Sequence, residues 1–558
     1  MKHQVQNDND DNADSTSAKA APRGLGRRAF LKSALATAPL LIAGPTLWLP
    51  RKTQAASLST LGPSTTTEPY LVPSIDGVKF VAILTVGDAI GNYRMVGIPD
   101  GLGAFNSGNG NLTLLMNHEI TNTIGRQGII RAHGSAGAFV SKWTINRKTL
   151  KVLKGEDLTP SPDDVFLWDS ATNQYLSGTT LWQRLCSADL PAESALYANG
   201  QGTRDRIFFD GEEVSDVASA RAWARIVTGP HAGEAWQLPR FGRLSYENTL
   251  ACPHPQDKTI VILNEDNNLS TAAVDTAFPS EVYVYIGRKK RNGHPIEQAG
   301  LTNGSLYGIT ITVNGKPVTE ESDLFGLGTS TTGFIDIGRF GLHNLGDVSD
   351  LTMLQLEQIS IAAGVARLQR PEDGAWDPRK KHHNDFYFVT TGNITPTDHH
   401  NSRLWRLRFD NIEHPEKGGT IEIVLKGDEG HEMLDNVTID HHGRILMDED
   451  PGNNPRVSKV WLYSIDTDEL IQVAQHNPTF FDPTILNSGS FITQDEESSG
   501  IVDAEETLGR GWFFLDVQAH KLSPDTDPEL VEGGQLLAMY VDPRIGKNKD
   551  DDDQDPNN

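Results

Sequence analysis

A loose internal repeat constrains the fold of this chain more than any other feature of its 558-residue sequence. In each instance an apolar run of strand length enters a polar or acidic cluster, a loop follows, and a second run with an aromatic centre comes next. The instances are LTLLMNHE with FVSKWTI, TIVILNEDN with EVYVYIG, FYFVTTGN with RLWRLRF, RILMDEDPGN with KVWLYSI, and SFITQDEESSG with GWFFLDV, and KFVAILTVGD begins a sixth. Short apolar runs separated by turns predict an all-β chain, and the 52 glycines and 30 prolines supply those turns.

Two strands of a propeller blade would produce such a repeat, because the innermost strands of a propeller deliver their ends to a central channel. Five or six units predict a β-propeller of about six blades, a single domain over residues 78–545 with long loop and helical insertions at 120–245 and 290–370. The helical periodicity of DLTMLQLEQISIAAGVARL (350–368) predicts a helix that packs on the outside. A decorated β-sandwich would use the same strands, and it remains the structural alternative.

The first 56 residues have the features of an export signal. RRAFLK, at residues 27–32, matches the twin-arginine pattern R-R-x-F-L-K, and Ala55 and Ala56 offer a cleavage site. The apolar stretch between them is interrupted by prolines and a glycine, which makes it a poor permanent membrane span. We therefore expect the twin-arginine export machinery to act on this chain and to place it in the periplasm or outside the cell, with no stable membrane span.

The two ends of the exported chain and its charge give further expectations. Residues 57–77 are rich in Ser, Thr and Pro and predict an extended lead-in, and residues 546–558 predict a disordered acidic tail. The formal net charge of −25 repels nucleic-acid phosphates, which argues against a general DNA or RNA binder, and we expect no nucleic-acid partner. The same charge suits a protein that binds polyvalent cations, because Asp and Glu oxygens are their natural ligands.

The repeat also carries the candidate chemistry, because polar clusters follow its strands. These clusters are Asn117-His118-Glu119, Asp210-Gly211-Glu212-Glu213, Tyr246-Glu247-Asn248, Glu265-Asp266-Asn267, Arg370-Pro371-Glu372-Asp373, Leu434-Asp435-Asn436, Asp448-Glu449-Asp450 and Asp495-Glu496-Glu497. If the strand ends converge on an axis, the carboxylates converge too, and they repel strongly unless protons or cations neutralise them. The pattern therefore predicts a multi-carboxylate site for calcium or transition-metal ions.

Three residues stand out as candidates for particular roles in that site. Arg370 and Glu372, in RPEDGAWDPR, would point to the same side of a strand. A fixed guanidinium beside bound cations is suited to gripping a phosphate bidentately while the carboxylate binds metal. Cys186, in LWQRLCSADL, is a candidate thiolate ligand for iron or zinc, although a disulfide with Cys252 is also open. G-x-S-x-G and phosphate-loop motifs are missing, which argues against a serine nucleophile.

Taken in order, these motifs resemble those of the PhoX-type alkaline phosphatases, a family of secreted bacterial β-propeller phosphatases and their relatives. An NHE box, a Cys before a small turn, a paired-Glu box, GRLSYEN, RPE, and DN…D…GR…D follow the twin-arginine signal between about residues 110 and 540. Members of that family hydrolyse phosphomonoesters with a cluster of iron and calcium ions. The resemblance therefore implies Ca²⁺ and Fe³⁺ as cofactors and a small phosphoester as substrate.

Matching the family's motifs residue by residue implies roles for positions of this sequence. The implied metal ligands are Glu119, Cys186 as an iron thiolate, Glu212, Glu213, Glu247, Glu372, Asp435 and Asp450. Arg370 and Glu372 would be the catalytic residues of a metal-dependent phosphomonoester hydrolase. Two alternatives remain: a phytase-like or lactonase-like propeller hydrolase that uses calcium alone, and a non-catalytic secreted protein that binds calcium.

Overall fold

The structure is a computed structural model that describes residues 59–123, 126–215, 220–267, 280–321, 337–392, 402–452, 456–485, 489–521 and 527–547. The chain forms two units, Met1–Thr53 and Gln54–Asn558, and every described residue belongs to the second unit. The predicted export signal at 1–56 and residues 548–558 of the predicted acidic tail lie outside the described residues.

The described chain is mostly β, with strands that run antiparallel to nearly all their neighbours. One sheet contains, in spatial order, β6 (Pro99–Gly108), β7 (Asn111–His118), β8 (Phe139–Asn146) and β9 (Val152–Asp157). The next contains β12 (Leu185–Asp189), β15 (Ile207–Glu212), β16 (Ala222–Ile226), β17 (Ala235–Gln237), β10 (Val165–Asp169) and β11 (Gln174–Ser177).

The largest sheet has nine strands in its main order, and β18 and β25 are its two end strands. It contains β18 (Tyr246–Ala251), β19 (Lys258–Glu265), β20 (Ser280–Arg288), β21 (Ser305–Val313), β23 (Ile337–Gly346), β28 (Gly419–Leu425), β27 (Arg403–Phe409), β26 (Asp385–Thr390) and β25 (Pro371–Trp376). In addition, β22 (Lys316–Val318) pairs with β21 and β24 (Arg367–Leu368) pairs with β20.

Two further sheets contain the C-terminal strands. One is β29 (Leu434–Ile439), β30 (Arg444–Glu449), β31 (Lys459–Ser464), β32 (Glu469–His476) and β2 (Leu71–Pro73). The other is β33 (Glu496–Asp503), β34 (Trp512–Ala519), β35 (Gly533–Val541), β3 (Val78–Thr85) and β1 (Ser59–Leu61). The predicted lead-in thus supplies β1 and β2, and N-terminal strands cover edges of the two C-terminal sheets.

The remaining elements are short. Two-stranded pairs are β4 (Ala89–Ile90) with β5 (Tyr93–Arg94), and β13 (Tyr197–Ala198) with β14 (Gln201–Gly202). The helices are α1 (Glu193–Leu196), α2 (Pro295–Gln298), α4 (Met353–Ala363), α5 (Pro478–Phe481) and α6 (Glu505–Leu508), and the 3₁₀ turns are η2 (Pro162–Asp164), η3 (Pro239–Phe241) and η4 (Pro415–Lys417). None of the helices formed by described residues has the length and apolar character needed to traverse a lipid bilayer.

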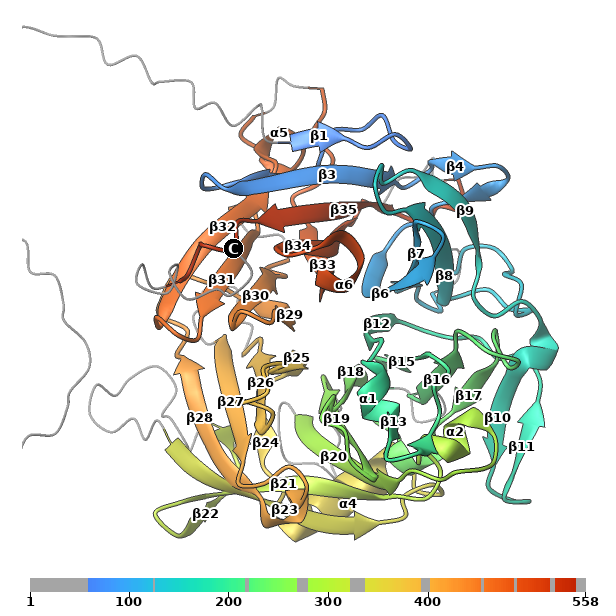
Figure 1. The fold of residues 1–558 in the computed structure, drawn as a ribbon, viewed down its shortest axis with the longest axis vertical. Coiled ribbons are helices and arrows are strands. Elements are labelled where there is room, and N and C mark those ends of the chain that lie inside the picture. Colours follow the sequence, from blue (N-terminus) through green and yellow to red (C-terminus); the bar gives the residue numbers. More distant parts are fainter. Residues whose placement is uncertain are drawn as a thin grey trace, which may run out of the picture. The chain divides into compact units, whose positions relative to one another are not determined.

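The helix predicted within 350–368 is confirmed as α4. The Thr352 hydroxyl oxygen accepts from the Gln355 amide in the first turn, and the Gln355 side-chain oxygen accepts from the Thr352 amide. The helix ends at Gly364, whose φ of 73° lies in the left-handed region that favours glycine. Figure 1 shows α4 beside the outer strands β21 and β23.

The inner strands β6, β12, β18, β25, β29 and β33 surround a common centre in Figure 1. In the part of the chain that the structure describes, each of them contacts the next in this order and β33 contacts β6, so the inner strands close a ring. The first residues of each inner strand therefore face those of the other inner strands. This closure decides which side chains can meet.

The apolar core lies between successive sheets. Trp143 on β8 and Phe514 on β34 belong to one cluster, and Phe209 on β15 and Tyr283 on β20 belong to another. A strand between two packed faces is buried on both sides, as β15 is along its whole length. This burial explains why the repeats read as continuous apolar runs and not as strict alternation.

Candidate metal centre

One register rule, repeated in six strand pairs of the described chain, builds the candidate site. At the start of each inner strand, the register partners are Pro99↔His118, Leu185↔Glu212, Tyr246↔Glu265, Pro371↔Thr390, Leu434↔Glu449 and Glu496↔Ala519. The residues that follow these partners on each strand are Asp100 and Glu119, Cys186 and Glu213, Glu247 and Asp266, Glu372 and Thr391, Asp435 and Asp450, and Glu497 and His520. All of them except Thr391 line one cavity.

The same backbone contact holds the register in every pair. The amide after the end of the second strand donates to the carbonyl of the residue directly before the inner strand, for example Glu119 N to Ile98 O at 2.9 Å and Glu213 N to Arg184 O at 2.9 Å. Ile98, Arg184, Arg370 and Met433 occupy this preceding position with φ of 51°, 41°, 58° and 44°. Left-handed backbone at a non-glycine residue costs about 1–3 kcal/mol, and it persists only where the surrounding structure imposes it.

The cavity has a volume of about 340 Å³ and is strongly acidic. Its lining carries ten carboxylates but only three cationic or imidazole side chains among the described residues. The lining residues are Asp100, Glu119, Arg184, Cys186, Glu213, Glu247, Asp266, Arg370, Glu372, Asp435, Asp450, Gly452, Asp495, Glu497 and His520. Carboxylates at this density repel one another strongly, so the geometry calls for protons or bound cations.

The electrostatics of the lining show that repulsion. Burial, followed by the charge of neighbouring carboxylates, raises the pKa of Asp450 to about 8. Burial also raises the pKa of Glu213 to about 7, against the opposing charge of Arg184. Burial is also the main reason why the pKa values of Glu247, Glu372 and Asp435 lie well above their ordinary range. Without bound cations, part of this set must be protonated near neutral pH.

Cys186 lies where two sets of candidate ligands meet. Its Sγ is 2.9 Å from Glu213 Oε2, a thiol donating to a carboxylate. Ligand atoms of Asp100, Glu119 and Cys186 lie within 4.8 Å of one another, and so do those of Cys186, Glu213 and Glu247. Burial and then the charge of Glu119 raise the pKa of the thiol well above its ordinary value. A thiolate at this position therefore needs a cation beside it.

Two arginines hold the carboxylates on one side of the cavity. Arg370 donates from Nε to both carboxylate oxygens of Asp266 at 3.0 Å and from Nη2 to Oδ2 at 2.7 Å, and its Nη2 lies 3.1 Å from Glu372 Oε1. Arg184 pairs with Glu119 at 2.7 Å and also with Glu213. The Arg184 side chain is 46% exposed, whereas that of Arg370 is 20% exposed. Arg184 is therefore the more accessible of the two guanidiniums.

A histidine and a glutamate form another part of the wall. His520 Nδ1 lies 2.8 Å from Glu532 Oε2, and its Nε2 lies 3.6 Å from Glu497 Oε2. Burial opposes the charge on His520, but these two carboxylates hold its pKa well above the ordinary value. Burial likewise works against ionisation of Glu497, yet the hydrogen bond from His520 brings the pKa of Glu497 below its ordinary value.

The structure brings seven of the predicted ligands together in the cavity, namely Glu119, Cys186, Glu213, Glu247, Glu372, Asp435 and Asp450, and it adds Arg370. Glu212 does not join them. Its carboxylate accepts from Arg221 Nε at 2.6 Å and from Trp223 Nε1 at 3.3 Å. Consecutive side chains on a strand point to opposite faces, so Glu213 and Glu212 cannot both face the cavity. The placement of Glu212 in the ligand set is corrected accordingly.

The predicted ligand set left out several lining residues, namely Asp100, Arg184, Asp266, Asp495, Glu497 and His520. Asp266, Asp495 and Glu497 stood in the quoted acidic clusters, and the register position of Asp266 and Glu497 would have singled them out. Asp100 and His520 have no acidic neighbours in the sequence that would mark them. Some of the quoted clusters follow a strand and others begin one. The cluster at Glu496 begins β33, so the observed strand comes after the run SFIT that was predicted as the strand.

The two cysteines lie apart and are both free, so the disulfide alternative is excluded. Cys252 is 4% exposed and packs in an apolar cluster with Ile260 and Trp376. It does not belong to the lining of the carboxylate cavity. Cys186 is therefore the thiol that could take part in chemistry there.

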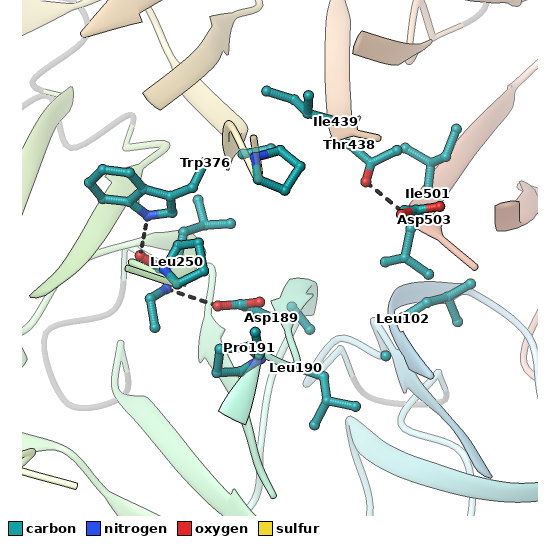
Figure 2. Close-up of a pocket in the computed structure, with 18 of the residues that line it drawn as sticks. Leu102, Asp189, Leu190, Pro191, Leu250, Trp376, Thr438, Ile439, Ile501 and Asp503 are labelled. Carbon is teal, nitrogen blue, oxygen red and sulfur yellow. Dashed lines mark hydrogen bonds between the residues drawn. The ribbon is translucent and has the colours of Figure 1, made fainter. Parts of the chain in front are cut away.

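A second cavity, of about 300 Å³, lies at the far ends of the same inner strands. Figure 2 shows Asp189 and Trp376 fixed at its wall, where Asp189 Oδ2 accepts from Ala251 N at 2.8 Å and Trp376 Nε1 donates to Leu250 O at 3.1 Å. Leu102, Leu190, Ile439 and Ile501 add apolar surface. The lining of this second cavity is partly apolar, whereas that of the carboxylate cavity is acidic. We therefore place the candidate metal site in the carboxylate cavity, at the first residues of the inner strands.

The fold and the site together define a mostly β protein whose structural neighbours are β-propeller proteins, with an acid-lined cavity at the inner strands. PhoX of Pseudomonas fluorescens, in complex with vanadate, a transition state analogue, is similar to this chain with a TM-score of 0.55 and 12% sequence identity, covering 85% of this chain and 97% of that one. At this identity the likeness concerns the fold.

Two other solved structures are more distant. The α-L-arabinofuranosidase Arb93A from Fusarium graminearum has a TM-score of 0.37 at 8% identity, over 81% of this chain and 96% of its own. The periplasmic gluconolactonase PpgL from Pseudomonas aeruginosa has a TM-score of 0.31 at 11% identity, over 68% of this chain and 85% of its own. No family model and no curated protein matches this chain.

Proposed function

We propose that this chain is a metal-dependent phosphomonoester hydrolase built on a six-bladed β-propeller, with calcium and iron bound in the carboxylate cavity. One observation carries the proposal: ten carboxylates and the thiol of Cys186 converge on a cavity that also holds Arg370 and Arg184. The likeness in fold to PhoX supports it, because that protein was solved in complex with vanadate, a transition state analogue.

The donor set fits the two metals. Carboxylate oxygens are the ligands that Ca²⁺ prefers, and a thiolate beside carboxylates is a ligand set for iron. The residues that would hold the ions are Asp100, Glu119, Cys186, Glu213, Glu247, Asp266, Glu372, Asp435, Asp450 and Glu497. When bound, such cations neutralise negative charge that develops on a phosphoryl group and lower the pKa of a bound water.

The protein's own contribution is to position and bind the phosphate. Arg370 is fixed by Asp266 and Glu372, so its guanidinium does not have to be ordered when an anion arrives. Arg184, half exposed, offers a second cation that attracts a dianionic substrate into an otherwise negative cavity. The described lining contains no serine or threonine, which agrees with hydrolysis by water and without a hydroxyl nucleophile.

The proposal is tested on the exported mature protein. We expect elemental analysis to find both calcium and iron, and p-nitrophenyl phosphate to be hydrolysed until a chelator removes the metals. Calcium without iron, together with turnover of phytate or lactones but not of simple monoesters, would replace the proposal with the calcium-only hydrolase. Bound calcium without turnover on a broad phosphoester panel would replace it with a calcium-binding protein that is not an enzyme.

Export in the folded state is part of the same proposal. The twin-arginine pattern RRAFLK belongs to residues outside the described part of the chain. A signal of this kind suits a protein that acquires its metals before it crosses the membrane. Replacing Arg27 and Arg28 with lysine should keep the protein in the cytoplasm, as fractionation would reveal, and continued export of this variant would refute the assignment.

A further inference from the structure

A second acidic cluster lies outside the cavity, at the junction of two strands and a helix. It consists of Glu265 at the end of β19, Glu281 on β20 and Glu357 on α4. These residues are 2%, 0% and 4% exposed. The carboxyl of Glu281 faces both of the others within hydrogen-bonding reach. Three carboxyls thus share one buried site that does not belong to the lining of the carboxylate cavity.

Most oxygens of this cluster lack a donor outside the three carboxyls. When all three are ionised, Glu281 receives no hydrogen bond at either oxygen, and Oε2 of Glu265 and Oε1 of Glu357 receive none either. Asn267 Nδ2 donates to the other oxygen of Glu265 at 3.2 Å. A buried carboxylate without a donor or a cation is strongly unfavourable, and three together add mutual repulsion.

Other buried glutamates of the chain differ in this respect. Glu212 is paired with Arg221 at 2.6 Å, and Glu321 with Arg403 at 2.6 Å. Near the cluster, Arg367 is paired with Glu320. Among the described residues no ion pair reaches Glu281, although it is the most deeply buried of the three. The charge of Arg367 acts on Glu357, but Arg367 forms its ion pair with Glu320, so the cluster lacks the direct arginine partner that its counterparts have.

We propose that Glu265, Glu281 and Glu357 bind one calcium ion, at a site separate from the carboxylate cavity. An all-oxygen set selects a hard cation over zinc or copper. A site this deeply buried requires the ion to lose most of its bound water. It therefore favours Ca²⁺ over Mg²⁺, because Mg²⁺ loses its water reluctantly. The site does not depend on the proposed phosphatase activity.

The position of this calcium site connects it to the cavity wall. Glu265 directly precedes Asp266, the carboxylate that holds Arg370. Glu281 pairs in register with Arg367 on β24, three residues before Arg370. A cation that joins β19, β20 and α4 therefore fixes the backbone on both sides of the Arg370–Asp266 pair.

Terbium, a luminescent substitute for calcium, gives a readout that a variant of Tyr283 can assign to this site. Tyr283 lies next to the cluster, since the charges of Glu281, Glu265 and Glu357 add to burial in raising its pKa well above the ordinary value. No tyrosine or tryptophan lines the carboxylate cavity in the described chain. We expect tyrosine-excited terbium emission from the full mature protein, competed by Ca²⁺. The Tyr283→Phe variant should lower this emission while it keeps the wild-type calcium content.

The variant Glu281→Gln has the shape of the wild-type side chain and removes one charge. We expect it to lose one calcium per chain with its iron content unchanged, and to lose the emission from Tyr283. In chelator it should be at least as stable as wild type, because it relieves repulsion, and in calcium it should gain less stability than wild type. The control Glu212→Gln should lose stability equally in both. Unchanged calcium content and emission in Glu281→Gln would overturn the proposal, whatever the phosphatase assay shows.

Discussion

Cys186 and Glu213 stand on neighbouring antiparallel strands, each one residue beyond the register pair Leu185↔Glu212, and the thiol donates to the carboxylate over 2.9 Å. Their equivalents on the other inner strand pairs are a carboxylate with a second carboxylate, a threonine or a histidine. This is therefore the position at which a soft ligand enters an otherwise hard set.

The first prediction concerns that thiol. Cys186→Ser should abolish the visible charge-transfer colour expected of iron bound through a thiolate, and it should remove iron while calcium remains. Absorption spectra and elemental analysis measure both. Cys252→Ser, which changes a buried thiol outside the cavity, is the matched control and should keep both metals. A coloured, iron-replete Cys186→Ser protein would show that the thiol is not a ligand.

The second prediction concerns the guanidinium at the cavity wall. Arg370→Lys replaces a bidentate donor with a point charge, so kcat/KM for p-nitrophenyl phosphate should fall by about 10²-fold with metal content unchanged. Arg339 makes a similar bidentate pair with Asp410, at 2.9 and 2.7 Å, on the surface. Arg339→Lys should leave kinetics unaltered. Equal kinetics for both variants would remove Arg370 from substrate binding.

The third prediction separates two adjacent glutamates. Glu213→Gln should alter metal content and activity, because its carboxylate lines the cavity. Glu212→Gln should keep the metals but lower the free energy of unfolding by about 3 kcal/mol, because it leaves the buried Arg221 without its partner. Urea denaturation and elemental analysis of both variants distinguish these effects. If Glu212→Gln lost metal in its folded state, the placement of this side chain would be wrong.

The fourth prediction concerns pH. His476 is fully buried, its Nε2 lies 2.6 Å from Ser498 Oγ, and burial lowers its pKa to about 3. The unfolded chain binds a proton near pH 6.5 that the folded chain does not bind, so this residue's contribution to stability falls as pH drops from about 6.5 towards 3. The loss approaches about 1.4 kcal/mol per pH unit within that window.

His476→Gln keeps a polar contact to Ser498 but cannot take up that proton. Denaturation curves at pH 7 and pH 4.5 should show a smaller loss of stability on acidification in the variant than in wild type. The metal sites contribute equally to both proteins, so the difference reports His476. An identical loss in the two proteins would show that the imidazole is protonated in the folded state.

Part of this architecture could be predicted from local pattern. The run RLWRLRF becomes β27 and KVWLYSI becomes β31, because apolar and aromatic runs of this length form strands when they are buried on both faces. The helix α4 was likewise predictable, since its periodicity and its capping residues lie within one short segment. Most of the acidic ligands could also be named, because they follow or precede such runs.

The details of the site could not be predicted in this way. Glu212 and Glu213 are equally plausible as ligands in the sequence, and a shift of one residue in the pairing of β12 with β15 would exchange their positions. Asp100 and His520 contribute to the same cavity from positions 420 residues apart, and neither stands in an acidic run. Arg184 reaches the lining of the carboxylate cavity from a residue with left-handed backbone, a conformation that its sequence does not indicate.

The sequence by itself determined many of the strands, the presence of a helix within 350–368, and that negative charge gathers next to the inner strands, but it did not show that the predicted insertions at 120–245 and 290–370 contain strands such as β15 and β21. These properties depend on neighbouring residues and on hydrophobic burial. Only the tertiary structure decided which carboxylates share a cavity, which pair with arginine, and which gather in the buried cluster between β19, β20 and α4. That decision depends on the register between strands and on closure of the ring, because side chains alternate in direction and long-range pairing sets the phase of that alternation.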